Sequence, residues 1–249
     1  MSKRRLTWRP DLPDHRDLIY GAINTSAPLP IKVDLRPLCS PVDDQGNIGS
    51  CTGHAIVGAM EYLENKQSES FADFSRLFVY YNERLMEGTV EHDAGARIRD
   101  GIKVVANTGC CIEGLWPYEV SKYKDKPTQD AYDNAANHKI LEYRRVTSFD
   151  DLKAALAEDN PVVFGFTVYE SFMSQAVAKT GLMPMPGRNE RSEGGHAVCA
   201  VGYDDETKTV TVRNSWGPNW GDHGYFHMPY AYISNYNLCD DFWVIKKEM

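Results

Sequence analysis

The chain of 249 residues lacks any long apolar run. No stretch approaches the ~18 apolar residues that a membrane-crossing helix needs, so we predict no membrane partner. The opening residues, MSKRRLTWRPDLPDHRD, are basic at first but are not followed by the apolar core of a secretory signal. The sequence leaves the compartment open between the cytoplasm and export from a longer precursor.

The sequence also has few basic residues. It contains 27 lysines and arginines and 35 acidic residues, so the net charge is −8. This balance argues against nucleic acid as the main partner. His223 and His227 are spaced like metal ligands, but positions four apart in a strand are separated by ~13 Å. We therefore predict neither a metal nor any other cofactor.

Cysteine is sparse and scattered, with six residues that form neither a CxxC pattern nor a disulfide framework. Two pairings remain open, Cys110 with Cys111 and Cys39 with Cys239. Most of the six are predicted to be buried thiols.

Three segments follow one another along the chain. Residues 1–28 are rich in Pro, Asp and Arg without apolar periodicity, and they predict an extended N-terminal arm that could act like a pro-segment. Residues 29–120 are predicted to form a mainly helical lobe, with helical stripes of apolar residues from Cys51 and around 74–85 and 96–107.

Residues 121–249 change character and are predicted to form a mainly β lobe. Their short runs of β-branched and aromatic residues are separated by turn residues. One further helix is expected near 149–157, with Ser148 as its N-cap. The order of helices and then strands predicts an α+β protein with a cleft between two lobes. The expected strands lie at 139–146, 161–169, 194–204, 207–215 and 224–230.

Cys51 has unusual surroundings for a cysteine that serves only packing. A small-residue turn, Gly49-Ser50, delivers it to the start of a helix, and Gln45-Gly46 precede that turn. The N–H groups and dipole at a helix N-terminus favour a thiolate. The alternative is an inert buried thiol, which would require neither Gly49 nor Gln45.

His196 is the best candidate for a base that would act on this thiol. It follows two glycines and opens the apolar strand HAVCAVGY, while Asn214 stands at the end of the next strand. On adjacent strands the asparagine oxygen can accept an imidazole proton and fix the tautomer. The alternative is a structural histidine that is satisfied by hydrogen bonds.

Three blocks, PVDDQGNIGSC, GGHAVCAVGYD and NSWGPNWGDHGYF, resemble the cysteine, histidine and asparagine blocks of the papain-like cysteine peptidases. The similarity extends to LPIKVDLR at 29–36 and to WPYE at 116–119. His196 lies 145 residues after Cys51, within the papain-type window of about 130–150 residues. Asn214 lies 163 residues after Cys51, which a small insertion accommodates.

The resemblance implies a papain-like two-lobe fold, with a helical left lobe, a β-barrel right lobe and the active-site cleft between them. It implies that Cys51 is the nucleophile, that His196 is its partner in an ion pair, and that Asn214 orients this histidine. Gln45, with the backbone N–H of Cys51, would form the oxyanion hole, and Trp216 would shield the His–Asn hydrogen bond from water.

The sequence also departs from the family pattern, as expected for a divergent microbial branch. Ile48 stands where the family usually has a half-cystine, and HDAGARI at 92–98 replaces its Gly-Cys-Asn-Gly-Gly stretch. Ile98 is either the wall of an apolar substrate pocket or plain helix core. The expected substrate-binding residues are Gly95, Ala96, Ile98, Gly195 and Trp216.

These features predict an endopeptidase that hydrolyses peptide or protein substrates through a thioester acyl-enzyme. The same residues would serve a transpeptidase, amidase or isopeptidase, and a non-catalytic binding module is a third alternative. We further expect the N-terminal arm to lie over or near the cleft and to restrain activity, with Trp8 and Leu12 as anchors. The alternative is a strand that only packs on the right lobe.

Overall fold

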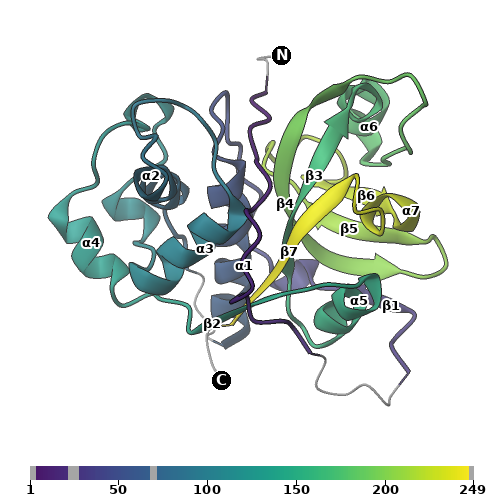
Figure 1. The fold of residues 1–249 in the computed structure, drawn as a ribbon, viewed down its shortest axis with the longest axis horizontal. Helices are drawn as coiled ribbons and strands as arrows, with labels where there is room; N and C mark the ends of the chain where they lie inside the picture. The colour runs from purple at the N-terminus through teal and green to yellow at the C-terminus, as the bar shows by residue number, and fades with distance from the viewer. Residues whose placement is uncertain (1–3, 22–27, 68–71, 247–249) are drawn as a thin grey trace.

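The computed structural model describes residues 4–21, 28–67 and 72–246, and within them the α+β class is confirmed (Figure 1). The helices expected from Cys51 and around 74–85, 96–107 and 149–157 are all present. Within these residues no helix combines the length and the apolar content needed to cross a membrane. The helices are α1 (Cys51–Gln67), α2 (Arg76–Met86), α3 (Ile98–Asn107), α4 (Gln129–Ala135), α5 (Phe149–Ala157), α6 (Gln175–Thr180) and α7 (Tyr230–Ile233).

One antiparallel sheet fills the second half of the chain. Its strands follow the order β2-β7-β3-β4-β5-β6, and β1 pairs with β4 beside this path. Among the described residues no pairing joins β2 to β6, so the sheet is open rather than the closed barrel that the family resemblance implies. The strands are β1 (Lys32–Asp34), β2 (Glu142–Arg145), β3 (Val162–Tyr169), β4 (Ser192–Asp204), β5 (Thr209–Arg213), β6 (Tyr225–Pro229) and β7 (Cys239–Lys246).

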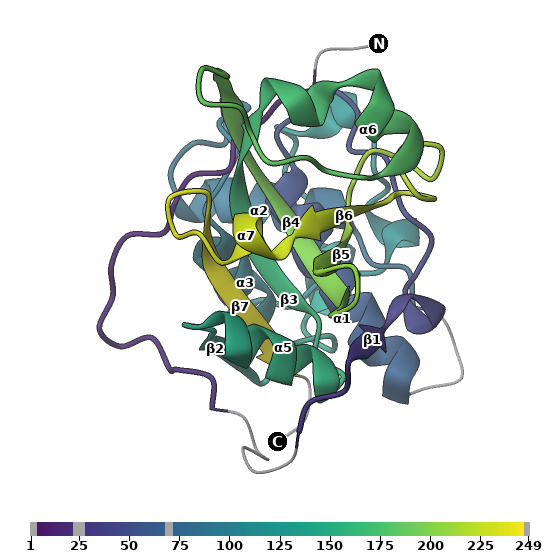
Figure 2. The same ribbon diagram turned by 90° about the vertical axis from the view of Figure 1, so that its right-hand side faces the viewer.

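Helices cover both faces of this sheet. Figure 2 shows α5, α6 and α7 on the outer face, with α1, α2 and α3 behind the strands. Helix α5 starts where expected, because the Ser148 hydroxyl accepts the Asp151 N–H at 3.0 Å as an N-cap. Helix α4 lies beyond the expected end of the helical lobe at residue 120, yet its Ala131 and Ala135 pack with Phe78 of α2.

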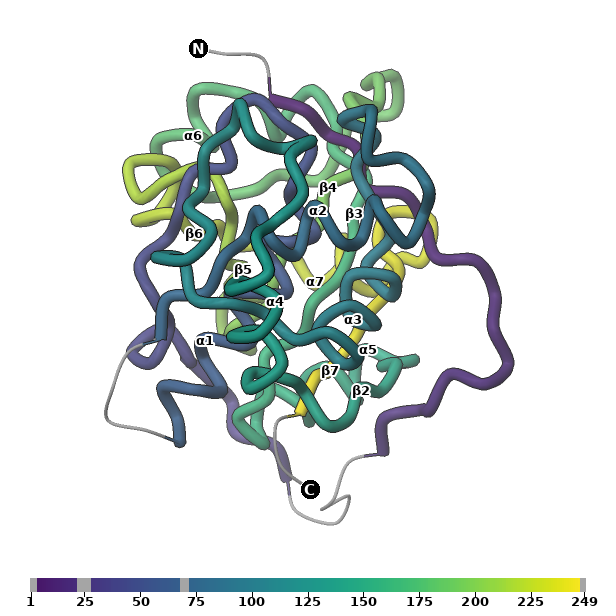
Figure 3. The backbone as a smooth tube through the Cα atoms, turned by 90° about the vertical axis from the view of Figure 1, so that its left-hand side faces the viewer, coloured from purple at the N-terminus to yellow at the C-terminus, as the bar shows by residue number. Residues whose placement is uncertain are grey.

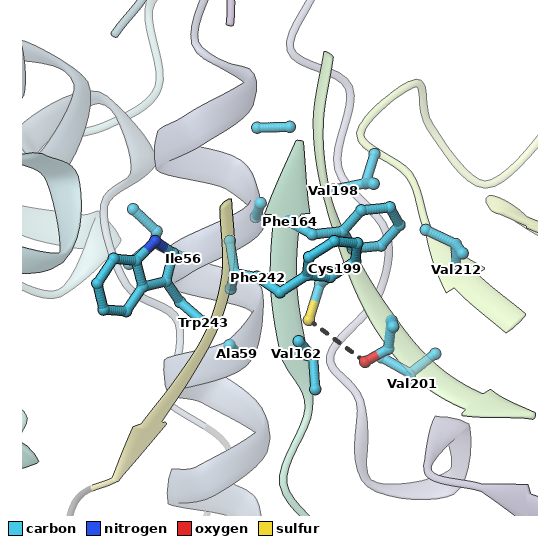
Figure 4. Close-up of a cluster of buried hydrophobic side chains, with 14 of the residues drawn as sticks. Ile56, Ala59, Val162, Phe164, Val198, Cys199, Val201, Val212, Phe242 and Trp243 are labelled. Carbon is cyan, nitrogen blue, oxygen red and sulfur yellow. Dashed lines mark hydrogen bonds between the residues drawn. The ribbon is translucent and has the colours of Figure 1, made fainter. Parts of the chain in front are cut away.

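The main core lies between α1 and the sheet, so the helix that begins at Cys51 is held along its length. Ile56 and Ala59 of α1 face apolar side chains of the central strands (Figure 4). These side chains are almost fully buried. Their burial, at roughly 25 cal/mol per Å² of apolar surface, is the main force that holds α1 against the sheet. The residues labelled on the strands are Val162, Phe164, Val198, Cys199, Val201, Val212, Phe242 and Trp243.

The described part of the arm runs between the two halves of the molecule, in front of α1 (Figure 1). Figure 3 shows it continuing along the outside past α3 and β7. Tyr20 fastens its far end: the side chain is buried, its N–H donates to Arg145 O at 2.8 Å, and its hydroxyl donates to Glu158 at 2.5 Å. Residues 1–3 and 22–27 of the expected arm lie outside the described residues.

Candidate active site

Cys51 is the first residue of α1, and the loop before it is tied to the loop that follows β5. Gln45 N–H donates to Ser215 O at 2.9 Å, and Gly217 N–H donates to Asp43 O at 3.0 Å. Gly46 makes the required turn with a left-handed φ of 67°, a conformation that costs glycine little. The sequence thus brings the Gln45 loop and the Asn214 loop to the same place, at the N-terminus of α1.

His196 and Asn214 meet as the sequence predicts. Asn214 Oδ1 lies 2.8 Å from His196 Nε2, and it also accepts the Ser215 N–H at 2.9 Å. Because an amide oxygen can only accept, Nε2 carries the proton, and Nδ1 is left as the basic nitrogen. That Nδ1 is buried without a hydrogen-bond partner. Trp216 stacks on the imidazole at 5.1 Å between ring centroids.

The Cys51 thiol lies next to the backbone of β4. There it accepts the N–H of Ala197, the residue that follows His196. Burial nevertheless raises the pKa of Cys51 to about 12, despite that N–H. Burial also lowers the pKa of His196 to about 4, although its bond to Asn214 favours the charged form. Both shifts disfavour the expected thiolate–imidazolium ion pair, because burial removes water from both groups. The ion pair stays a prediction.

Gln45 is fully buried at the same N-terminus, with both ends of its carboxamide held. Its Nε2 donates to Ile48 O at 2.9 Å, and its Oε1 accepts the Ser215 hydroxyl at 2.6 Å. Because an amide nitrogen has two protons, a second N–H remains for another acceptor.

The sequence interpretation missed two residues that fix this loop, Tyr118 and Asp93. Tyr118 donates to Gln45 O at 2.9 Å and shares a 2.6 Å hydrogen bond with Ser50, next to the cysteine. Asp93 accepts the Gly49 N–H at 2.8 Å. The WPYE segment, which contains Tyr118, was one available signal, but nothing local tied Asp93 to the turn before Cys51.

Most of the expected substrate-binding residues contact the arm. Trp8 N–H donates to Gly195 O at 3.0 Å, and Arg9 N–H donates to Ala96 O at 3.3 Å. A Cβ at Gly95 would overlap Thr7, so this glycine is required for the close approach. Ile98 is fully buried in the main core, and Trp216 lies near the arm's Arg4.

Trp8 is the strongest apolar attachment of this part of the arm. Its side chain is 8% exposed, and its ring occupies space left by Gly165 and Gly195, where a Cβ would collide with it. The second expected anchor, Leu12, is wrong, because its side chain is 62% exposed. Asp11 holds the chain there instead: its N–H donates to Asp241 at 2.7 Å, and its carboxylate accepts the Trp243 indole N–H at 3.0 Å.

All six cysteines are free thiols, so neither of the two open pairings is formed. Five of them are buried, and Cys39 is partly exposed.

Comparison with protein families matches residues 29–242 to the papain family of cysteine proteases. The chain belongs to this family. The matched range begins at Leu29, the start of the predicted resemblance, and it spans the segments that contain Gln45, Cys51, His196 and Asn214. The prediction of a papain-like cysteine peptidase, a hydrolase, is therefore confirmed.

A viral and a bacterial relative, the first two of the three described here, place the protein in a divergent microbial branch of the family. An uncharacterized peptidase C1-like protein, L477 of Acanthamoeba polyphaga mimivirus, is 47% identical over 82% of this chain and 69% of its own length. The crystal structure of xylellain, a cysteine protease from Xylella fastidiosa, has 45% identity, full coverage of both chains and a TM-score of 0.91. Cysteine proteinase 3 of Entamoeba histolytica is 28% identical over 92% of this chain and 70% of its own length.

Proposed function

We propose that this papain-family protease is an endopeptidase in which Cys51 attacks the peptide carbonyl. His196 Nδ1 takes the thiol proton and later gives it to the leaving amine, while Asn214 holds the ring in the required tautomer. The observation that carries the proposal is the buried, unpartnered Nδ1 on an imidazole whose other nitrogen is 2.8 Å from Asn214 Oδ1.

The oxyanion that forms at the carbonyl needs donors aimed at it. We assign this role to the second N–H of Gln45 Nε2 and to the backbone N–H of Cys51. The first N–H of Gln45 is fixed on Ile48 O, and its oxygen is fixed on Ser215. The carboxamide is thus preorganised. After the amine has left, His196 Nδ1 takes a proton from water, the resulting hydroxide attacks the thioester carbonyl, and the C–S bond breaks as that proton returns to the Cys51 sulfur.

A peptidyl epoxide is expected to modify Cys51 ahead of the other five cysteines, because only Cys51 stands beside a base and at a helix N-terminus. Intact mass should show one adduct, and peptide mapping should place it on residue 51. Cys39, the partly exposed thiol, serves as the internal control. Equal labelling of Cys39 and Cys51, or labelling that His196→Ala leaves unchanged, would contradict the proposal.

Hydrolysis and acyl transfer use the same thioester, so products distinguish an endopeptidase from a transpeptidase, amidase or isopeptidase. Incubation of a peptide with an added amine is expected to give mainly two hydrolysed fragments. Predominant coupling of the acyl fragment to the amine would favour the transpeptidase.

We further propose that the arm occupies the cleft and restrains activity. Its support is the set of contacts that Thr7, Trp8 and Arg9 make with residues expected to bind substrate. A substrate must displace these contacts. In this proposal the departure of the arm readmits water to the site, which makes the thiolate of Cys51 easier to form.

Removal of residues 1–28 is expected to raise kcat/KM on a small peptide substrate, and addition of the arm as a peptide should reverse the gain. In the full chain, Trp8→Ala should give part of the same increase because it removes the buried anchor. Leu12→Ala is the matched control and should change little, since Leu12 is exposed. Unchanged kinetics with lower thermal stability would show that the arm is only structural packing.

A further inference from the structure

A pocket that holds a guanidinium lies beside Trp216. Its polar wall is the Asp44 carboxylate and Gly46 O, and its aromatic wall is Trp216. A cavity of about 470 Å³ remains beside Arg4, which lines it together with these walls and with Asn47, Met173, Ala178 and Trp220. We call it the Asp44 pocket.

Arg4 of the arm lies in this pocket, and its guanidinium contacts both the polar wall and the aromatic wall. Its Nη1 and Nη2 donate to the two oxygens of Asp44, the second at 3.2 Å, and Nη1 also donates to Gly46 O at 3.1 Å. The guanidinium carbon lies 5.7 Å from the centre of the Trp216 ring. A bidentate carboxylate, a carbonyl and an aromatic face together recognise arginine better than lysine.

Asp44 is held in place by its neighbours, and its carboxylate is accessible to an arginine side chain. Its carboxylate accepts the Gly46 N–H at 2.8 Å, and an antiparallel bridge holds its backbone to Trp216. Its side chain is nevertheless 50% exposed, so it stays accessible from solvent. Asp93, which pairs with Arg5, differs: it is 8% exposed and accepts the Gly49 N–H, so it is already used in holding the loop.

The pocket lies next to the proposed reacting groups. Trp216, whose ring faces Arg4, also stacks on His196. The guanidinium and the imidazole therefore both contact the same tryptophan ring. A side chain that reaches this pocket belongs to a substrate residue close to the bond that is cleaved.

From this geometry we propose that the Asp44 pocket selects substrates that carry an arginine near the scissile bond. Arg4 of the arm occupies the position that the guanidinium of such a substrate would take. The inference rests on the proposed endopeptidase function and names its substrate class: peptides with an arginine on the Trp216 side of the cleaved bond.

The test uses the full chain and short internally quenched peptides in which arginine, lysine or glutamine is placed at each position in turn. At one position arginine should exceed glutamine in kcat/KM by about tenfold or more, with lysine between them. Asp44→Asn should bring this ratio near 1. Because the ratio compares two substrates on one enzyme, any general effect of the arm on activity cancels.

Two further variants complete the test. Asp130→Asn, on the exposed face of the distant helix α4, removes the same charge and should keep the ratio of the native chain. Arg4→Ala opens the pocket and should keep the arginine preference while raising kcat/KM.

Ratios near 1 at every position, in both the native chain and Arg4→Ala, would overturn the inference, and so would a preference that Asp44→Asn retains. Such results leave the proposed function intact, because cleavage itself is still seen. Failure to cleave any peptide, with no epoxide adduct on Cys51, would instead remove the proposed function and this inference with it.

Discussion

Replacement of His196 by alanine is expected to lower kcat/KM for peptide hydrolysis by about 10⁴-fold or more, the scale seen when the base of a nucleophile–base pair is removed. The variant lacks the only nitrogen that we place to take the Cys51 proton, and burial already raises the pKa of this thiol to about 12. Both turnover and epoxide labelling should fall together, because each requires the thiolate.

His92→Ala is the matched control for this variant, since His92 is exposed. It should keep normal activity. Thermal unfolding of both proteins shows whether each is folded. A folded His196→Ala protein with activity close to that of the native chain would contradict the role of His196 as the base.

Gln45→Ala is expected to lower kcat by about 10²–10³, the loss that follows removal of one oxyanion-hole donor. Epoxide labelling of Cys51 should be largely retained, because the nucleophile and its base are untouched. This separation of turnover from labelling distinguishes the Gln45 variant from the His196 variant. Steady-state kinetics and intact mass measure the two quantities on the same sample.

Ser215→Ala provides a graded comparison. It keeps the Gln45 donor but removes the hydroxyl that fixes the carboxamide oxygen at 2.6 Å. A smaller loss in kcat is expected, because the donor becomes less well oriented. If folded Gln45→Ala kept full kcat, the assignment of the oxyanion hole would be wrong.

The helices of both halves were predictable because their signals are local. The stripe of apolar residues from Cys51 and the Ser148 cap operate within a few turns of one helix. Strand β7 (Cys239–Lys246) was missed, although its residues FWVI are apolar. Its place between β2 and β3 depends on partners about 100 and 80 residues earlier in the chain, which no local pattern specifies.

The arm is a second case in which local sequence was not enough. Its apolar residues predicted attachment, and Trp8 is indeed buried, but sequence could not distinguish Trp8 from Leu12. Trp8 has a place only because glycines stand at positions 165 and 195 of two neighbouring strands. Asp11 is held by Asp241 and Trp243, more than 200 residues away.

By itself the sequence determined the residues proposed to carry the chemistry: a cysteine at a helix N-terminus, a histidine on one strand, an asparagine directly after the next strand, and a glutamine ahead of the turn. These are properties of residue type and short-range geometry. Only the tertiary structure decided how deeply these groups are buried and which residues contact the arm. Desolvation and ion pairing depend on which distant atoms surround a group. The burial that raises the pKa of Cys51 and lowers the pKa of His196, and the Arg4–Asp44 contact, therefore appear only once the chain has folded around them.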